Sequence, residues 1–212
     1  MTYICLHGFM GEPEDWQAWP EPKSCPSLSD YPINRGLRGW AKAFNSDPRW
    51  QTLTNPILVG YSLGGRLALH AITEENHPWK QAILLSTHPG FKTAQEKQER
   101  LKHDQQWAHR FLTEPWDTVW ADWNAQSIFS GTFQPRTPNP KLAADQLNFL
   151  SLGHQDYLEP ALPTHWITGA RDTKFTALCA PFSHHTIIPN AGHRLLNSEV
   201  MQKMRAWPQF FA

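Results

Sequence analysis

The chain is poor in cysteine and carries no excess charge of either sign. Its three cysteines, Cys5, Cys25 and Cys179, are odd in number and widely spaced, which argues against a disulfide framework or a zinc site and indicates a reducing compartment. Nineteen basic residues balance 19 acidic ones, and no basic block stands out, so binding to nucleic acid or to a membrane surface has no electrostatic support. No apolar run reaches transmembrane length, and no secretion signal is recognisable. We therefore expect a cytoplasmic protein.

Short apolar runs alternate with helical patterns along the chain. A chain of 212 residues can bury one sizeable core, and no flexible linker, repeat or low-complexity segment divides it. Strands are predicted at 3–6, 56–59, 81–86, 163–168 and 186–189. This alternation is typical of an α/β protein with a mostly parallel sheet and helices on both faces.

The most informative stretch is Gly60-Tyr61-Ser62-Leu63-Gly64, a G-x-S-x-G pattern. It follows an apolar strand and leads into a helix of small and apolar residues. The turn is sharp and crowded, so only glycine fits at its two ends. We interpret it as a nucleophile elbow that lifts the Ser62 hydroxyl off the sheet edge. An elbow in this context predicts the α/β-hydrolase fold.

A serine hydroxyl needs a histidine base, and the histidine needs an orienting carboxylate. In the α/β-hydrolase arrangement the chain order is Ser, Asp, His. Asp172 follows the strand predicted at 163–168, and His193 follows the last predicted strand. Since open α/β sheets place their sites at the carboxyl ends of strands, we predict a triad of Ser62, Asp172 and His193.

The turn after the first strand, His7-Gly8-Phe9, completes the expected machinery. In this fold such a turn presents one backbone N–H to an oxyanion, and the residue after the nucleophile presents the other. We assign these amides to Phe9 and Leu63. The first strand lies so close to the N-terminus that the leading antiparallel hairpin common in the fold is expected to be missing.

The strand–helix alternation is interrupted in the middle of the chain. A long polar stretch rich in helix formers, a helix that restarts after Glu114-Pro115, and a further helix after 135–140 separate the fourth predicted strand from the third. We expect residues 1–91 and 161–212 to form the core and residues 92–160 to form an inserted helical cap. Caps cover the site and set specificity. Four tryptophans at 107–123 serve either for helix packing or as an aromatic wall over a pocket.

Two arginines narrow the chemistry. Arg66 is one helical turn after Ser62 and shares its face of the helix. The helix behind an elbow is usually buried, and a buried guanidinium needs an anionic partner. That partner is either an internal Asp or Glu or a carboxylate of the substrate, which Arg grips bidentately. Arg100, in the first cap helix, is a second candidate clamp, although by itself it would be a solvated surface charge.

Motifs spread from His7 to His193 resemble one enzyme family. They are Gly60-Tyr61-Ser62-Leu63-Gly64-Gly65-Arg66, His88-Pro89-Gly90, Glu96-Lys97 with Arg100, Gln106-Trp107-Ala108-His109-Arg110-Phe111, Ala121-Asp122-Trp123, Gly169-x-x-Asp172-x-Lys174-Phe175 and Ala191-Gly192-His193. The chain is similar to the 2-succinyl-6-hydroxy-2,4-cyclohexadiene-1-carboxylate (SHCHC) synthases of menaquinone biosynthesis.

The resemblance implies a lyase that eliminates pyruvate from an enolpyruvyl cyclohexene tricarboxylate, with the triad serine as the base. It implies a pocket for a small polycarboxylate, with Lys174 assisting. The residues that would line this pocket are Tyr61, Arg66, Arg100 and Trp123. We expect no metal or organic cofactor, since no metal-spaced His/Cys cluster or dinucleotide loop is visible.

Two other functions remain open. The first is a hydrolase of the same fold: a carboxylesterase, a thioesterase or a C–C bond hydrolase, which needs no clamp for several carboxylates. The second is a non-catalytic binding protein, a class that usually loses a triad residue. The sequence leaves the oligomeric state open.

Overall fold

The structure, a computed structural model, describes residues 2–20, 22–129 and 132–205. Six strands form one sheet in the order β2-β1-β3-β4-β5-β6. The strands are β1 (Thr2–Leu6), β2 (Lys23–Ser24), β3 (Pro56–Tyr61), β4 (Gln81–Leu85), β5 (Thr164–Gly169) and β6 (His185–Ile188). Every strand pair in the described residues is parallel, so the described sheet contains no antiparallel hairpin.

Both faces of the sheet are buried. Alternate residues of β1 show this: Ile4 and Leu6 belong to one apolar cluster, whereas Tyr3 and Cys5 belong to another. Helices α1 (Gly36–Asn45) and α3 (Leu63–Thr73) cover the first face, and α8 (Ser198–Arg205) covers the second. Two-sided burial explains why the strands read as continuous apolar runs. Two short helices, α2 (Pro48–Gln51) and α7 (Thr173–Cys179), complete the core.

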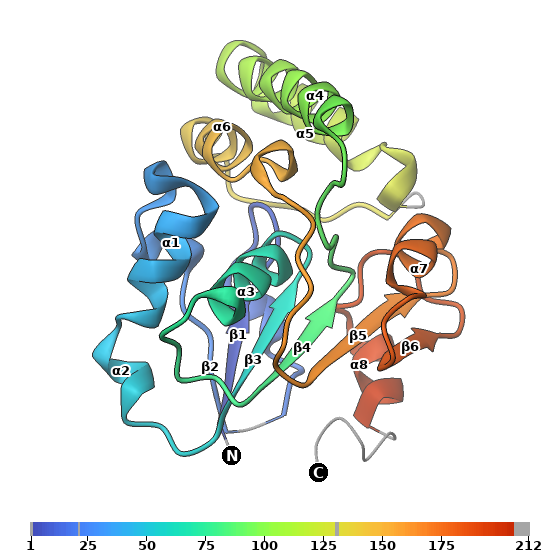
Figure 1. The fold of residues 1–212 in the computed structure, drawn as a ribbon. Helices are drawn as coiled ribbons and strands as arrows, with labels where there is room; N and C mark the ends of the chain where they lie inside the picture. The colour runs from blue at the N-terminus through green and yellow to red at the C-terminus, as the bar shows by residue number, and fades with distance from the viewer. Residues whose placement is uncertain (1, 21, 130–131, 206–212) are drawn as a thin grey trace.

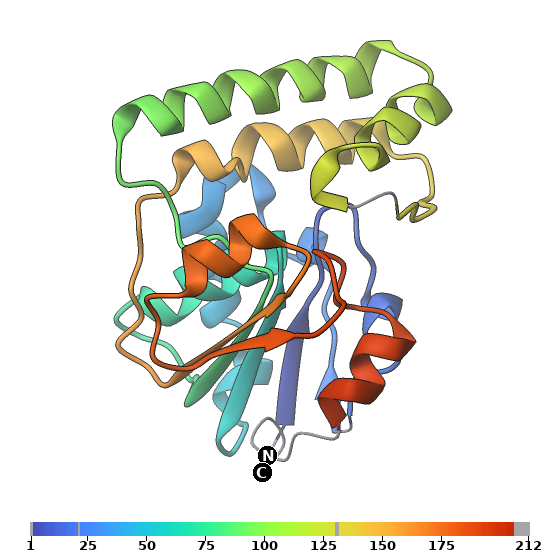
Figure 2. The same ribbon diagram turned by 90° about the vertical axis from the view of Figure 1, so that its right-hand side faces the viewer.

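Three further helices lie in a layer over the carboxyl ends of the strands (Figures 1 and 2). They are α4 (Ala94–Thr113), α5 (Trp116–Asn124) and α6 (Pro140–Phe149). Helix α4 begins at a capping box in which Thr93 and Glu96 bond to each other's backbone N–H, a strong start signal. These helices fall within the segment at 92–160 that the sequence marks as an insertion.

The entry to this helical layer and the exit from it run side by side. Tyr157 N–H donates to Phe91 O at 3.0 Å, and Leu158 N–H donates to Pro89 O at 2.8 Å. Gly90 has φ +111°, and a Cβ there would lie 2.0 Å from Asp156 O, so only glycine allows this approach. The two segments that connect the helical layer to the core are therefore hydrogen-bonded to each other.

None of the helices in the described residues is both long and apolar enough to cross a membrane.

Candidate active site

The serine lies in a strained turn between β3 and α3. Ser62 has φ +52° and ψ −109°, a conformation that costs energy in a non-glycine residue and marks functional sites. A Cβ at Gly64 would lie 2.3 Å from Leu6 O and from His7 O, and one at Gly60 would lie 2.5 Å from Gly65 Cα. The glycines therefore let the turn pack directly against β1 and α3.

The structure brings Ser62, His193 and Asp172 together from three segments. Ser62 Oγ lies 3.1 Å from His193 Nε2, and His193 Nδ1 lies 2.7 Å from Asp172 Oδ2. Asp172 and His193 are both buried. Because a carboxylate can only accept, Nδ1 carries the proton and Nε2 is left to accept from the serine hydroxyl. This is the geometry of a serine activated by a histidine base.

Neighbouring groups hold the histidine in place. Ser86 Oγ–H donates to His193 O at 2.9 Å, and the Phe175 ring packs edge-on at 4.6 Å from the imidazole. Ser86 also has a positive φ of +45°, so a second strained residue lies directly after β4. The sequence offered no signal for Ser86 beyond its place at the end of a strand.

The two residues predicted to supply oxyanion amides lie in the turn after β1 and at the start of α3. Phe9 and Leu63 both line the pocket at Ser62, and Leu63 is the first residue of α3, where backbone N–H groups have no intrahelical partner. The turn before Phe9 is fixed by His7, which donates through Nδ1 to Gly8 O at 3.0 Å and accepts at Nε2 from Leu28 N–H at 3.2 Å. Burial lowers the pKa of His7, which keeps it neutral for this role.

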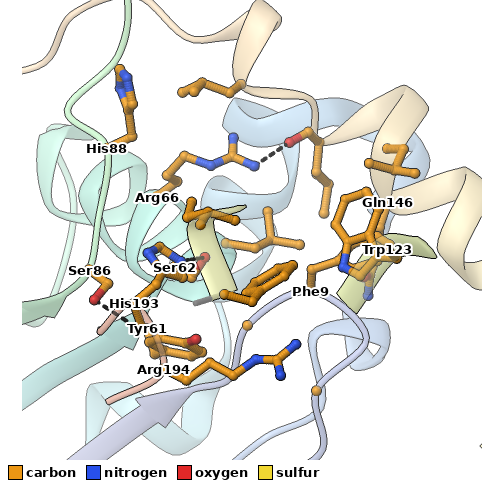
Figure 3. Close-up of a pocket in the computed structure, with 18 of the residues that line it drawn as sticks. Phe9, Tyr61, Ser62, Arg66, Ser86, His88, Trp123, Gln146, His193 and Arg194 are labelled. Atoms are coloured by element: carbon orange, nitrogen blue, oxygen red, sulfur yellow. Dashed lines mark hydrogen bonds between the residues drawn. The ribbon is translucent and has the colours of Figure 1, made fainter. Parts of the chain in front are cut away.

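A pocket that is open to solvent lies between the strand ends and the helical layer; its volume is about 940 Å³ when the solvent at its mouth is included. Figure 3 shows its labelled side chains around Ser62 and His193. Of the residues predicted to bind substrate, four line it: Tyr61, Arg66, Arg100 and Trp123. Lys174 does not. It is exposed on α7 and lies outside the pocket lining, while the next residue, Phe175, turns inward.

Arg66 has no acidic partner within 4.0 Å in the described residues. Its Nη2 donates to Leu150 O at 2.8 Å, and its buried Nη1 has no hydrogen-bond partner. Burial and the nearby charge of Arg100 lower the pKa of the guanidinium to about 9. A buried cation without an anion is costly, which favours an anion supplied from outside.

Arg100 is held by an internal acid. Its Nε lies 2.8 Å from Asp104 Oδ1, and Asp104 Oδ2 accepts from Ser151 Oγ–H at 2.7 Å. Burial raises the pKa of Asp104, but hydrogen bonds from His103 and Arg100 outweigh it and hold that pKa below its usual value. The ion pair therefore aims the Arg100 guanidinium along the pocket wall.

Two more arginines line the pocket. Arg136 Nη2 lies 2.6 Å from Asp15 Oδ2, a pair that joins the helical layer to the segment after β1. Arg194, next to His193, donates to Asn124 Oδ1 at 2.5 Å and to Thr132 O. These contacts bring together groups from opposite ends of the chain.

Curated relatives match nearly the whole sequence. A 2-succinyl-6-hydroxy-2,4-cyclohexadiene-1-carboxylate synthase from Escherichia coli is 31% identical over 220 residues, which cover 90% of this chain and 85% of the relative. A synthase of the same name from Klebsiella pneumoniae subsp. pneumoniae is 29% identical over 223 residues, with the same coverage. The chain belongs to this family. No protein-family model matches the sequence.

Solved structures confirm the α/β-hydrolase fold of this SHCHC synthase family member. MenH from S. aureus superposes with a TM-score of 0.82 at 19% identity, over 99% of this chain and 94% of that chain. A thermophilic esterase from Thermogutta terrifontis superposes with a TM-score of 0.68 at 17% identity, over 99% and 90%. The fold prediction from the elbow and chain order is therefore correct.

Some lining residues carried no usable sequence signal. Arg136 lies in the proline-rich loop at 135–140, which has no periodic pattern, and its partner Asp15 is 121 residues away. Arg194 could have been found, because it directly follows the triad histidine in sequence. Of the four tryptophans at 107–123, Trp120 and Trp123 line the pocket and the other two do not. Each of the two predicted roles therefore applies to part of the cluster: the aromatic wall to Trp120 and Trp123, and helix packing to Trp107 and Trp116.

No group of three or more His, Cys, Asp or Glu side chains is arranged to hold a metal ion in the described residues.

Proposed function

We propose that this protein is a lyase of menaquinone biosynthesis. Its substrate would be 2-succinyl-5-enolpyruvyl-6-hydroxy-3-cyclohexene-1-carboxylate, and its products pyruvate and 2-succinyl-6-hydroxy-2,4-cyclohexadiene-1-carboxylate. Membership of the synthase family supports the reaction. The observation in this pocket that best supports the proposal concerns Arg66. Its buried guanidinium lies one helical turn from Ser62 and has no acidic partner in the described residues.

The names of substrate and product define the electron flow. A base removes the proton from the ring carbon that bears the succinyl ketone. The released electron pair forms a new ring double bond, the existing double bond shifts by one position, and the C–O bond to the enolpyruvyl group breaks. Enolpyruvate takes up a proton on carbon and becomes pyruvate. Atoms and electrons balance without an oxidant, a reductant or water.

The triad supplies the base. Asp172 holds His193 with Nε2 free, and His193 takes the proton of Ser62 as Ser62 removes the substrate proton. No acyl-enzyme forms in this scheme. As the proton leaves, negative charge develops on the succinyl ketone oxygen. The backbone amides of Phe9 and Leu63 would stabilise that charge, as an oxyanion hole does.

The substrate carries three carboxylates, which explains the arginines. Arg66 and Arg100 would bind carboxylates at one side of the pocket, where a planar guanidinium makes two parallel bonds. Tyr61 and Trp123 would pack against the ring; burial raises the pKa of Tyr61, so its phenol is neutral. The segment at 92–160 supplies Arg100 and Trp123 and would act as the cap that sets specificity. Lys174 has no role in this scheme, because it lies outside the lining.

The decisive experiment compares two reactions on one preparation. Pyruvate release from the enolpyruvyl tricarboxylate and hydrolysis of a p-nitrophenyl ester are measured with no added metal or cofactor. The proposal expects efficient pyruvate release and poor ester turnover, since a simple ester leaves the arginines unpaired. Ser62→Ala serves as the matched control and should abolish pyruvate release. Efficient ester turnover with a burst of acyl-enzyme, and no pyruvate, would make the protein a hydrolase.

A further inference from the structure

The charged side chains of the pocket fall into two groups. Arg66 and Arg100 share one carboxylate, Asp104, and the pKa of Arg66 responds to both of these neighbours. Arg136 and Arg194 are also close enough for their charges to interact, and of these two only Arg136 is paired with a carboxylate, that of Asp15, in the described residues. Each group thus has two guanidinium ions for one carboxylate, and each carries one uncompensated positive charge.

The two uncompensated charges lie on opposite sides of the serine. Figure 3 shows Arg66 above the Ser62–His193 pair and Arg194 below Tyr61. Arg66 comes from α3 in the core, and Arg194 comes from the loop after β6. A ligand bound over Ser62 therefore meets a guanidinium at each end.

We propose that Arg194 is a substrate-binding residue that receives a carboxylate at the end of the pocket opposite to Arg66. This inference rests on the proposed function, because it assigns one of the three carboxylates of the proposed substrate to Arg194. The pocket would then select a substrate whose two carboxylates are far enough apart to reach Arg66 and Arg194, with Ser62 between them.

The contacts of Arg194 in the structure are all neutral. Its guanidinium donates to Asn124 Oδ1 and Thr132 O, and it lies 4.2 Å above the Phe129 ring. No carboxylate lies within 4.0 Å of it in the described part of the chain. Burial lowers the pKa of Arg194, and the neighbouring charge of Arg136 lowers it further. Neutral acceptors fix the direction of the guanidinium but leave its charge unbalanced.

Asp15 cannot balance Arg194 as well. Its carboxylate is only 12% exposed and both oxygens are engaged: each accepts from Arg136 Nη2, and Oδ2 also accepts from Glu12 N–H. A carboxylate of the substrate is therefore the anion that fits. It would gain a charge-assisted bond to a half-buried guanidinium that already stacks on Phe129.

The alternative is that Arg194 has only a structural role and joins the core to the helical layer. The two roles predict different responses in two variants. Arg194→Gln removes the charge, whereas Asn124→Ala removes one neutral partner and leaves the guanidinium in place. If the role of Arg194 is only structural, both variants weaken the contact between the core and the helical layer. If Arg194 binds a carboxylate, only Arg194→Gln removes the binding site.

The first test does not depend on turnover. Tricarballylate is titrated against the tryptophan fluorescence of the protein, since Trp120 and Trp123 line the pocket. We expect Arg194→Gln to bind it about 30-fold more weakly, the lower range for truncating one member of a buried charge pair. Arg194→Lys should fall between, because the planar fork is lost but the charge is kept. The exposed Arg38→Gln should bind as the unaltered protein does, and Asn124→Ala should lose less affinity than Arg194→Gln, because it removes one neutral acceptor and keeps the charge.

The second test identifies the carboxylate. Each of the three carboxylates of the substrate is converted in turn to its methyl ester, and kcat/KM is followed by the absorbance of the conjugated diene product. One ester should be penalised in the unaltered protein but not in Arg194→Gln, since the interaction it removes is already absent. The other two esters should be penalised equally in both proteins.

The outcomes separate the two proposals. Equal affinity of Arg194→Gln and the unaltered protein for tricarballylate, including no binding by either, overturns the Arg194 assignment. So does an equal loss in Asn124→Ala and Arg194→Gln, or an unchanged set of ester penalties. Absence of pyruvate release by the unaltered protein overturns the lyase proposal instead, and the fluorescence titration still decides the role of Arg194.

Discussion

Replacing Arg66 with methionine should make the folded protein more stable and the enzyme far less active. Both effects have the same cause, a guanidinium that has no acidic partner in the described residues and that, in the proposed function, receives its anion from the substrate. Methionine keeps much of the side-chain volume and removes the charge and the unpaired Nη1. Stability and activity should therefore change in opposite directions, as expected where a site stores unfavourable free energy for function.

The gain in stability can be worked from the environment of the guanidinium. Burial is the chief cause that lowers its pKa to about 9, which corresponds to roughly 5 kcal/mol against the charged form. The variant loses the bond from Nη2 to Leu150 O, which contributes about 1 kcal/mol and leaves that carbonyl unpaired at about 1–3 kcal/mol. We expect a net gain of about 1–3 kcal/mol in the free energy of unfolding.

The pH dependence has a definite sign. Because the pKa of Arg66 is lower in the folded protein than in the unfolded chain, the unfolded chain binds more protons as the pH rises above about 9. The cost of the buried charge is therefore complete below pH 9 and is relieved as the pH rises above it. The stability advantage of Arg66→Met should be constant near neutral pH and should shrink above pH 9.

The loss in activity follows from the bound state. Removing one partner of a buried charge pair costs about 2–5 kcal/mol, so kcat/KM for pyruvate release should fall by about 30-fold to several thousand-fold. Arg66→Lys should recover only part of it. Urea unfolding and steady-state kinetics measure the two effects, with the exposed Arg38→Met as the matched control. A variant that is less stable than the unaltered protein, or one that keeps its activity, would refute the reasoning.

Three further outcomes follow from the site. Ser62→Ala should lower turnover by several orders of magnitude with the fold intact, and a double variant with Asp172→Asn should be little worse, because the triad acts as a unit; circular dichroism and kinetics check both. Gly64→Ala should destabilise the protein by at least about 3 kcal/mol, or prevent folding, because its Cβ would meet Leu6 O at 2.3 Å. Asp104→Asn should cost about 3–5 kcal/mol in urea unfolding, since it leaves a guanidinium beside a neutral amide; a loss below about 1 kcal/mol would contradict this.

Most of the sheet and the triad could be predicted from sequence because their signals are local. An apolar run followed by G-x-S-x-G leaves one stereochemical solution, which places Ser62 on a turn where φ is positive. Asp172 and His193 each follow a strand, and parallel strands bring their carboxyl ends to one edge. Helix α4 begins after the Thr93 cap and ends before Pro115, after which α5 begins, and α6 begins at Pro140. Helix α1 was not among the predicted elements, although Leu37, Trp40, Ala41 and Phe44 have the apolar spacing of a helix.

Only the tertiary structure decided which charges meet. The sequence could place Arg66 beside Ser62, but whether an internal acid balanced it depended on α4 and α6, which arrive from far along the chain. Lys174 and Arg194 are both cationic, and each lies within two residues of a triad residue in sequence, yet Lys174 is exposed on α7 and Arg194 lines the pocket. Elements and turns follow from short-range sterics, which neighbouring residues encode. The balance of charge in a pocket follows from packing between distant segments, which no local pattern records.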